Sequence, residues 1–581
     1  MALLPQMDYE YNERSVTDVF AGYNHRPKIG DGEFYNTQNM TTACFPLLAN
    51  RRRRGLVRRL TAPGGILAKE KLALIENGAL LYGGEETGLR GLTPGEKQMV
   101  SMGAYLCIFP DKLYFNTADP SDCGSMEAVY RSSGKIRCCL CRRDGTPYEN
   151  LTVSKEAPPE PANAAHWLEP QAGKLFEWSA AGGQWTQIET LYTKIEFSTN
   201  GILPRRFREN DGVTISGTRS DMLNGSKILH AVGGGEGELD YIVVTGFQEN
   251  SFTQSEGSVT IRRTVPDMDF VCEAKNRLWG CKYGTVDGKT VNELYCSALG
   301  DFRNWEQYMG LSTDSWRASV GSDGPWTGAV NYLGYPMFFK ENRIHRVSVS
   351  AIGAHQVSET VCRGVQAGCG RSLQVVNETL LYKSRADVCA FQGSFPESVS
   401  DALGDETYSD ASAGSVGDRY YLSMKDAAGK RSLFVYDVKQ GLWMREDEMQ
   451  VLQFAALGGE LYAMTPEALW ALNGSAGEPE AFVSWCAESG IQGYQFPDRK
   501  YVSRFNLRLW MEEGAEADVY LRYDSGGDWV RQGRIKMKGT RTVTLPVRPR
   551  RCDHFQMRIC GRGDVKLYSI AKILSIGSDV G

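Results

Sequence analysis

The sequence predicts an all-β protein: a β-propeller of about six blades, with a small inserted β domain and a C-terminal β-sandwich. Three observations indicate this fold. Apolar and polar residues alternate with a period of two along much of the chain, and helical periodicity is rare. The 63 Gly, 12 Trp and 27 Tyr are typical of many strands joined by turns. The third observation is a short hairpin pattern that recurs along the chain.

The recurring hairpin has an apolar strand, a charged turn and a second apolar strand. Clear copies are Tyr105–Asn116, Pro336–Val347, Thr379–Phe391 and Glu460–Leu472. The spacing of the last three predicts a further copy at Asp418–Asp437, and Asn276–Leu299 fits an earlier one. Strand pairs repeated every 40–45 residues or so are typical of propeller blades. One blade cannot bury both of its faces, so we expect the blades to stack around an axis.

Loss of the repeat divides the chain into five predicted parts. They are an extended N-terminal assembly arm (1–60), the first blades (61–120), an inserted β domain with the Pro-rich loop Lys155–Pro170 (121–267), the remaining blades (268–476) and the sandwich (477–581). Period-two patterns predict the sandwich strands Arg504–Met511, Ala517–Asp524, Arg541–Val547 and His554–Cys560. In the first of these, Phe505, Leu507 and Leu509 share the face expected to be buried.

Charge and composition exclude several classes of protein. The formal net charge is −5 and the pI about 5.9, so there is no general case for nucleic-acid binding. No run of apolar residues approaches the length of a membrane span, and the N-terminus lacks the pattern of a signal peptide. The 15 Cys are odd in number and scattered, which favours reduced, buried thiols.

No catalytic motif stands out, so we expect a protein that is not an enzyme, with no catalytic residues, no cofactor and no metal. There are only six His, and Cys138, Cys139 and Cys141 lack the spacing of a zinc site. The alternative of a propeller glycosidase rests on Gly321–Gly328, which partly matches the Asp-box of sialidases. A structural turn is the favoured interpretation of that stretch.

A run of arginines is the clearest candidate for a contact surface. The predicted partner-interface residues are Arg51, Arg52, Arg53, Arg54, Arg58 and Arg59, together with Phe45 and Leu47. So dense a cluster in an acidic chain suits an acidic partner surface, whereas the simpler alternative is a solvated loop.

The segment Phe20–Gly55 resembles the opening of β-propeller tail-hub and nozzle proteins of tailed bacteriophages. The family includes the packaged-DNA stabilisation and tail tubular protein types. The matching positions are Asn39, Phe45, Pro46, Leu47, Leu48, Arg54 and Gly55. Ser297–Trp305 and Arg548–Val580 are also similar to that group.

The resemblance implies a non-enzymatic structural virion protein in a phage tail or head–tail junction. We therefore expect a homo-oligomeric ring, typically six-fold, around the DNA exit channel, with other tail or adaptor proteins as partners. DNA would pass without sequence-specific binding, and assembly would occur in the host bacterial cytoplasm, without a membrane span. The alternatives are a tail-tip receptor- or glycan-binding protein that uses the terminal sandwich as a lectin-like module, and a propeller glycosidase.

Overall fold

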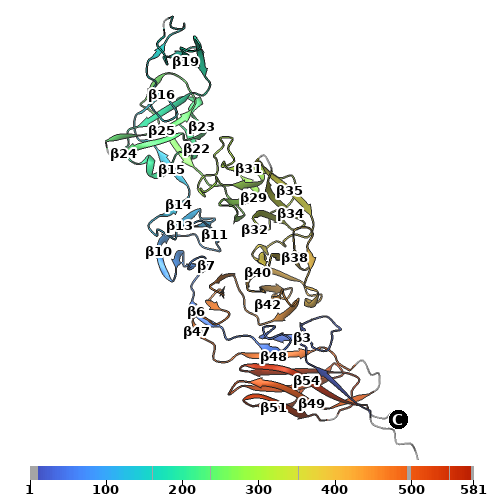
Figure 1. Cartoon of the computed structure of the whole chain (residues 1–581). Helices are drawn as coiled ribbons and strands as arrows, with labels where there is room; N and C mark the ends of the chain where they lie inside the picture. The colour runs from blue at the N-terminus through green and yellow to red at the C-terminus, as the bar shows by residue number, and fades with distance from the viewer. Residues whose placement is uncertain are drawn as a thin grey trace, which may run out of the picture.

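The computed structural model describes residues 11–159, 161–235, 237–350, 353–493, 499–548 and 550–576. Figure 1 shows three parts in a row, with the inserted domain at one end, the propeller in the middle and the sandwich at the other end. Strands dominate and the one α-helix described, α1 (Leu203–Arg206), is a single turn, which confirms the all-β class. No helix in the described ranges has both the length and the apolar character needed to cross a membrane.

Seven four-stranded blades can be traced in the described residues. The strands of each blade are given from the axis outward. Blades 1 and 2 are β7 (Pro63–Ala68), β8 (Leu72–Glu76), β9 (Ala79–Tyr82) and β10 (Glu85–Arg90), then β11 (Gln98–Met102), β12 (Tyr105–Phe109), β13 (Leu113–Asn116) and β14 (Cys123–Ser125). Blades 3 and 4 are β28 (Phe270–Glu273), β29 (Leu278–Val286), β30 (Lys289–Cys296) and β31 (Trp316–Ser319), then β32 (Gly328–Tyr332), β33 (Tyr335–Lys340), β34 (Arg343–Val349) and β35 (His355–Val361).

Blades 5 and 6 are each continuous in sequence, whereas the last blade takes strands from both ends of the propeller sequence. Blades 5 and 6 are β36 (Gln374–Val376), β37 (Thr379–Lys383), β38 (Val388–Phe391) and β39 (Glu397–Ser398), then β40 (Tyr408–Val416), β41 (Arg419–Asp426), β42 (Arg431–Asp437) and β43 (Leu442–Arg445). Blade 7 is β44 (Gln453–Leu457), β45 (Glu460–Met464), β46 (Ala468–Ala471) and β6 (Gly55–Arg59), with β47 (Glu478–Pro479) beyond β6. The propeller is therefore closed by a strand from near the N-terminus.

The innermost strands contact one another in cyclic order, from β7 through to β44 and back to β7. Between blades 4 and 5 the contact runs through the short 3-10 helix η2 (Gly370–Ser372), and η3 (Asp401–Leu403) follows blade 5. Gln98 of blade 2 donates to the carbonyl of Val271 of blade 3 (2.6 Å) and accepts from its N–H (3.1 Å). Gln453 of blade 7 accepts from Ile66 N–H of blade 1 (3.0 Å). These amide side chains pair with backbone as an extra strand residue would, and they join neighbouring blades.

The structure confirms the predicted propeller and adds a blade. All six hairpins predicted from the sequence are the second and third strands of blades 2 to 7. The seventh hairpin, β8 and β9, turns at Asn77 (φ 50°) and Gly78 (φ 70°). An Asn-Gly pair with both residues at positive φ is the preferred two-residue turn between antiparallel strands.

The inserted domain leaves the propeller between blades 2 and 3 and contains three sheets. They are β15 (Ala128–Arg131), β27 (Thr260–Arg263), β22 (Gly212–Ser216) and β23 (Gly225–Ile228); then β24 (Ala231–Gly235), β25 (Glu238–Thr245), β21 (Tyr192–Phe197), β16 (Ile136–Cys141) and β26 (Ser251–Gln254); and, at the far end, β17 (Leu151–Val153), β18 (His166–Glu169), β19 (Lys174–Ser179) and β20 (Gln184–Ile188). η1 (Asp221–Leu223) and α1 flank the first two sheets. Buried Arg263 and Asp211 form an ion pair (2.6 Å) at the base of the domain.

The C-terminal sandwich is confirmed, and both ends of the chain build it. One sheet contains β4 (Met40–Thr41), β5 (Leu48–Asn50), β54 (Val565–Ile576), β49 (Lys500–Met511) and β52 (Gly539–Pro546), with β1 (Tyr11–Thr17) also paired to β54. The other contains β2 (Gly22–Tyr23), β3 (Glu33–Gln38), β48 (Ser484–Ser489), β53 (Phe555–Arg562), β50 (Glu516–Tyr523) and β51 (Gly526–Lys536). Phe505, Leu507 and Leu509 are buried between the sheets, as their alternation predicts.

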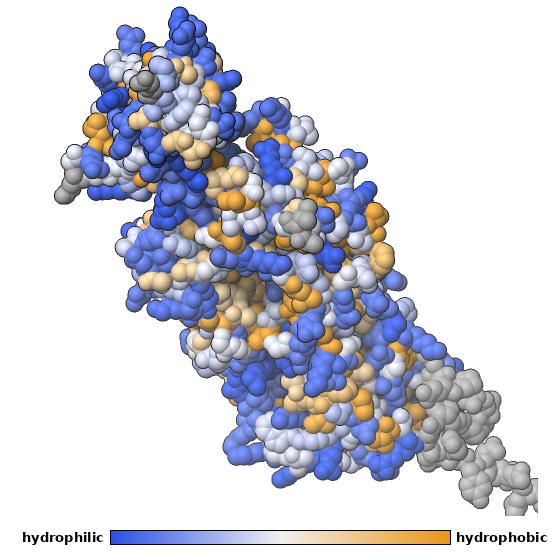
Figure 2. All heavy atoms as spheres, turned by 45° about the horizontal axis from the view of Figure 1, so that its top comes forward, coloured by the Kyte–Doolittle hydropathy of each residue, from blue (hydrophilic) through white to orange (hydrophobic). Residues whose placement is uncertain are grey.

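Within the predicted assembly arm (1–60), the described residues 11–59 supply strands to the sandwich and to blade 7 of the same chain. Tyr23 of β2 pairs with Trp443 of β43, so the sheet of blade 6 continues into the sandwich. Cys486 and Cys560 lie opposite each other on β48 and β53 and form a disulfide, so the expectation of reduced cysteines is wrong for this pair. On the face shown in Figure 2, hydrophilic residues cover most of the inserted domain, and hydrophobic residues are scattered over the rest.

Closure by β6 predicts an effect of Gly55→Ala. A Cβ atom at Gly55 would lie 1.8 Å from the carbonyl oxygen of Ala476, so the closing strand would have to move. We expect a loss of about 1–3 kcal/mol in unfolding free energy, measured by calorimetry. Val57→Thr, at an exposed position of the same strand, is the control and should change it by less than about 0.5 kcal/mol. Equal unfolding free energies for the two variants would contradict a closing role for β6.

Candidate functional site

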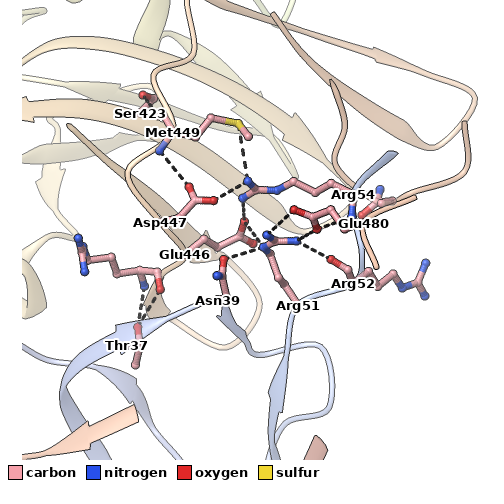
Figure 3. Close-up of polar contacts among 12 residues, drawn as sticks. Thr37, Asn39, Arg51, Arg52, Arg54, Ser423, Glu446, Asp447, Met449 and Glu480 are labelled. Carbon is pink, nitrogen blue, oxygen red and sulfur yellow. Dashed lines mark hydrogen bonds and ion pairs between the residues drawn. The ribbon is translucent and has the colours of Figure 1, made fainter. Parts of the chain in front are cut away.

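Arg51 and Arg54 anchor the segment that runs from the sandwich into the propeller (Figure 3). Arg51 binds Glu480 through both terminal nitrogens, with Nη1–Oε2 at 2.7 Å and Nη2–Oε1 at 3.2 Å. Its Nε donates to Asn39 Oδ1 (2.7 Å). Glu480 also accepts from the backbone N–H of Arg54 (2.9 Å). The segment before β6 is therefore bound to the segment that leads into the sandwich.

Arg54 is 2% exposed and binds two consecutive carboxylates that follow blade 6. Its Nη2 donates to Glu446 Oε2 (2.6 Å) and its Nη1 to Asp447 Oδ2 (2.5 Å). Burial alone would raise the pKa of Asp447, but the charge and hydrogen bond of Arg54 outweigh burial and lower it. Burial alone would likewise lower the pKa of Arg54, and the two carboxylates raise it. The charges are thus paired inside the fold.

The structure places the other predicted interface residues around this pair. Arg53 binds Glu512 of the sandwich (2.6 Å), and Arg58 binds Glu76 of blade 1 (3.0 Å). Arg52, Arg59 and Phe45 are exposed, and Leu47 is half-buried. The acidic groups nearest to Arg51, Arg53, Arg54 and Arg58 therefore belong to the chain itself. Contact of the run with a partner protein stays a prediction.

A cleft of about 810 Å³ lies beside this cluster, and we call it the junction cleft. Its walls come from the N-terminal segment, from blade 6, from the start of the loop that follows β46 of blade 7, and from the sandwich. They include Thr42, Phe45, Asn50, Arg51, Arg52, Asp418, Arg419, Tyr421, Asp437, Lys439, Gln440, Glu446, Asn473, Trp510, Asp564 and Lys566. Three of the predicted interface residues, Phe45, Arg51 and Arg52, therefore lie in its wall.

Aromatic and charged groups share the wall of the junction cleft. Trp510 of β49 is half-buried, and the ammonium of Lys566 lies 5.6 Å from the centre of its ring. Asp437 accepts from Thr42 Oγ1 (2.7 Å) and Gln440 N–H (3.0 Å), so both of its oxygens are occupied. Sequence reasoning missed Trp510, although it alternates with the buried residues of its strand and so had to face outward.

Several polar groups of the junction cleft retain free bonding capacity. Within the described part of the chain, Asp418 accepts from Asn377 and Asp564 from Asn50, each through Oδ1 only. In the ranges that the structure describes, the side chains of Arg52 and Lys439 have no hydrogen bond or ion pair. The cleft thus offers acceptors and donors side by side.

The propeller axis holds a second cavity, of about 450 Å³, at the beginning of the innermost strands. Arg371 of η2 spans it, binding Glu96 before β11 through both terminal nitrogens (2.6 Å each) and the carbonyl of Leu452 (2.9 Å). Asp269, the other carboxylate in the wall, binds Lys282 (2.7 Å) and Tyr283 N–H (2.8 Å). Both carboxylates are therefore engaged within the chain.

The stretch Gly321–Gly328 connects β31 to β32 and makes contacts within the propeller. The carbonyl of Ser322 accepts from the buried ammonium of Lys340 (2.5 Å), which lies 4.5 Å from the Trp326 ring centre. Among the described residues, no group of three or more His, Cys, Asp or Glu could hold a metal ion. Burial raises the pKa of Cys138, Cys139 and Cys141 on β16.

No family model and no curated protein matches the chain. Among solved structures, it is similar to an exo-β-1,3-galactanase from Phanerochaete chrysosporium, solved with galactose (10% identity, 52% of this chain and 94% of that chain, TM-score 0.23). It is also similar to a glycoside hydrolase family 43 arabinoxylan arabinofuranohydrolase from Bacillus subtilis, solved with cellotetraose (10% identity, 52% and 94%, TM-score 0.19). At these values the likeness assigns no activity to this chain.

These comparisons correct two predictions. The sequence led us to expect a non-enzymatic structural virion protein that forms a ring around a DNA exit channel, whereas the solved structures found are glycoside hydrolases. We retain neither the virion ring function nor the exclusion of enzymatic activity. The resemblance to phage tail proteins, the oligomeric ring, passing DNA and the virion location are not tested by a single chain and stay predictions.

The arginine cluster predicts a loss of stability in acid. The pKa of Asp447 and that of Glu480 are lowered, because the arginines outweigh burial, so both groups stabilise the fold above their unfolded pKa values near 4. This stabilisation is lost as the pH falls from about 5 towards 3. Glu480→Gln should cost about 1–3 kcal/mol at pH 7 and flatten the acid dependence of the unfolding midpoint.

Glu478→Gln is the matched control, because Glu478 is exposed two residues away. The unfolding midpoint of the Glu478→Gln variant should depend on pH as that of the unmodified protein does. If Glu480→Gln gave the same profile as this control, the bond between Arg51 and Glu480 would have no part in joining the propeller to the sandwich.

Proposed function

We propose that the chain binds carbohydrate and that an oligosaccharide occupies the junction cleft. The observation that carries the proposal is the combination, in one open cleft of about 810 Å³, of an indole face with unoccupied hydrogen-bond donors and acceptors. A sugar ring has an apolar face and an edge of hydroxyl groups, and each hydroxyl group both donates and accepts. The two kinds of group in the wall match those two sides of a sugar.

Trp510 supplies the apolar contact. Its strand, β49, lies inside a sheet between β52 and β54, so the backbone that carries the ring is paired on both sides. Buried neighbours Leu509 and Met511 hold the strand from the opposite face. An aromatic ring held in this way loses little side-chain freedom on binding, which favours affinity.

The rim supplies the polar contacts. Asp418 lies at the turn between β40 and β41, and Asp564 lies immediately before β54, so the two free Oδ2 atoms belong to the propeller and to the sandwich. Arg52 and Lys439 add charged donors from the N-terminal segment and blade 6. A ligand in the cleft would therefore contact both parts of the molecule, whose relative position the arginine cluster holds in advance.

Trp510→Ala tests the proposal. We expect an array of neutral, amino and acidic oligosaccharides to identify ligands of the unmodified protein, and calorimetry to give their affinities. The variant should weaken binding about tenfold or more, equivalent to at least about 1.4 kcal/mol, because the sugar loses its stacking surface. Reducing ends measured in the same incubations would show whether a bound saccharide is also cleaved.

Trp529→Ala is the matched control. Trp529 is a half-buried tryptophan of the same sandwich, but its ring packs against Arg522 and Arg558, outside the cleft. The affinity of the Trp529→Ala variant for the saccharide should stay within about twofold of that of the unmodified protein. The proposal fails if no saccharide binds, or if both tryptophan variants weaken binding equally.

A further inference from the structure

A separate cavity of about 210 Å³ lies between blades 3 and 4, and we call it the blade 3–4 pocket. It is formed by the turn between β28 and β29, the loop after β30, the turn between β32 and β33, and the ends of β34 and β35. Its lining residues include Lys275, Arg277, Trp279, Leu299, Pro336, Val347, Val349 and His355. These turns lie on the opposite face of the propeller from the start of the innermost strands, so this pocket is distinct from the axial cavity. It is also distinct from the junction cleft, which is lined by blade 6, the loop after β46 and the sandwich.

The charges in this pocket are all of one sign. Among the residues that the structure describes, Lys275 and Arg277 line it and no Asp or Glu does. Arg277 is 5% exposed, and its guanidinium donates to backbone carbonyls of Ser297 (2.9 Å), Ser312 (2.5 Å) and Asp314 (2.7 Å). These bonds engage both terminal nitrogens, and within the described residues they leave its positive charge without a carboxylate. A buried charge is ordinarily paired, so this one favours an anion in the pocket.

His355 adds a second polar group without a partner. Its ring packs edge-on against Trp279 (5.1 Å) and Trp316 (5.5 Å), and its Nδ1 is buried with no hydrogen bond in the described part of the chain. Burial, followed by the charges of Arg277 and Lys275, lowers the pKa of His355. The imidazole is thus neutral at pH 7, and the positive charge in the pocket belongs to Arg277 and Lys275.

The rest of the wall is apolar. Trp279 and Val347 are buried, and Pro336 lies beside them. Leu299 and Val349 stand at the mouth with exposed fractions of 47% and 49%. Large apolar side chains exposed around a small cavity favour a ligand with an apolar part.

We propose that the blade 3–4 pocket binds a small amphipathic anion, with its carboxylate beside Arg277 and Lys275 and its apolar body against Trp279, Pro336 and Val347. A volume of about 210 Å³ suits a short acyl chain or a single aromatic ring. The proposal is independent of carbohydrate binding in the junction cleft.

Octanoate and benzoate, each paired with its neutral counterpart (1-octanol and benzamide), test the charge requirement by calorimetry on the full chain. The carboxylates should bind at least about tenfold more tightly than the neutral compounds, and Lys275→Met should reduce that difference. Lys275 is exposed, so this variant keeps the fold that loss of Arg277 would endanger.

Val349→Glu gives the sharpest variant, because it places a carboxylate in the wall at an exposed position. It should abolish binding of both anions. Val361→Glu is the control and should leave binding unchanged, because Val361 is 67% exposed on the neighbouring strand β35 and lies outside the pocket. Equal affinity for neutral and anionic compounds, binding that survives Val349→Glu, or no binding of either anion would each overturn the proposal.

Discussion

Burial of Arg54 is the constraint on which the arrangement of the molecule depends. The guanidinium of Arg54 is 2% exposed, and the two carboxylates that pair with it, Glu446 and Asp447, lie almost 400 residues further along the chain. Arg51 adds Glu480 in the same way. The closing strand β6, the end of blade 6 and the entrance to the sandwich must therefore come together in a single arrangement. The junction cleft is the space left beside that meeting point.

Local pattern was sufficient for the hairpins and the sandwich strands. Alternation placed Phe505, Leu507 and Leu509 on the buried face, because one strand residue in two must face the core when a sheet has one solvated side. The hairpin at Asn77 and Gly78 carries a strong turn signal of its own and was missed because its turn lacks the charged residues of the other copies. Closure by β6 had no local signal, because the strand it pairs with lies more than 400 residues further along the sequence. Leu56, for example, pairs with Trp470.

The sites show the same division between local and distant information. The arginine run was visible in the sequence, but a partner such as Glu480, itself in a segment of little regular structure, is found only in the folded chain. Trp510 was predictable as outward-facing from its neighbours, yet its use in a cleft depends on Asp418 and Lys439 of blade 6. In the blade 3–4 pocket, the informative fact is the lack of acidic residues in the wall, which no single stretch of sequence reveals.

Closure of the propeller by β6 also sets the order in which a newly made chain can fold. Gly55–Arg59 leaves the ribosome early, while its partner strand Ala468–Ala471 follows more than 400 residues later. At roughly 5–20 residues per second, the early strand waits on the order of 20–80 s with an unpaired edge. During that interval the basic run beside it also lacks Glu446, Asp447 and Glu480. The nascent chain therefore exposes a cationic, strand-forming segment whose edge, with Arg51 and Arg54, is paired only in the finished protein.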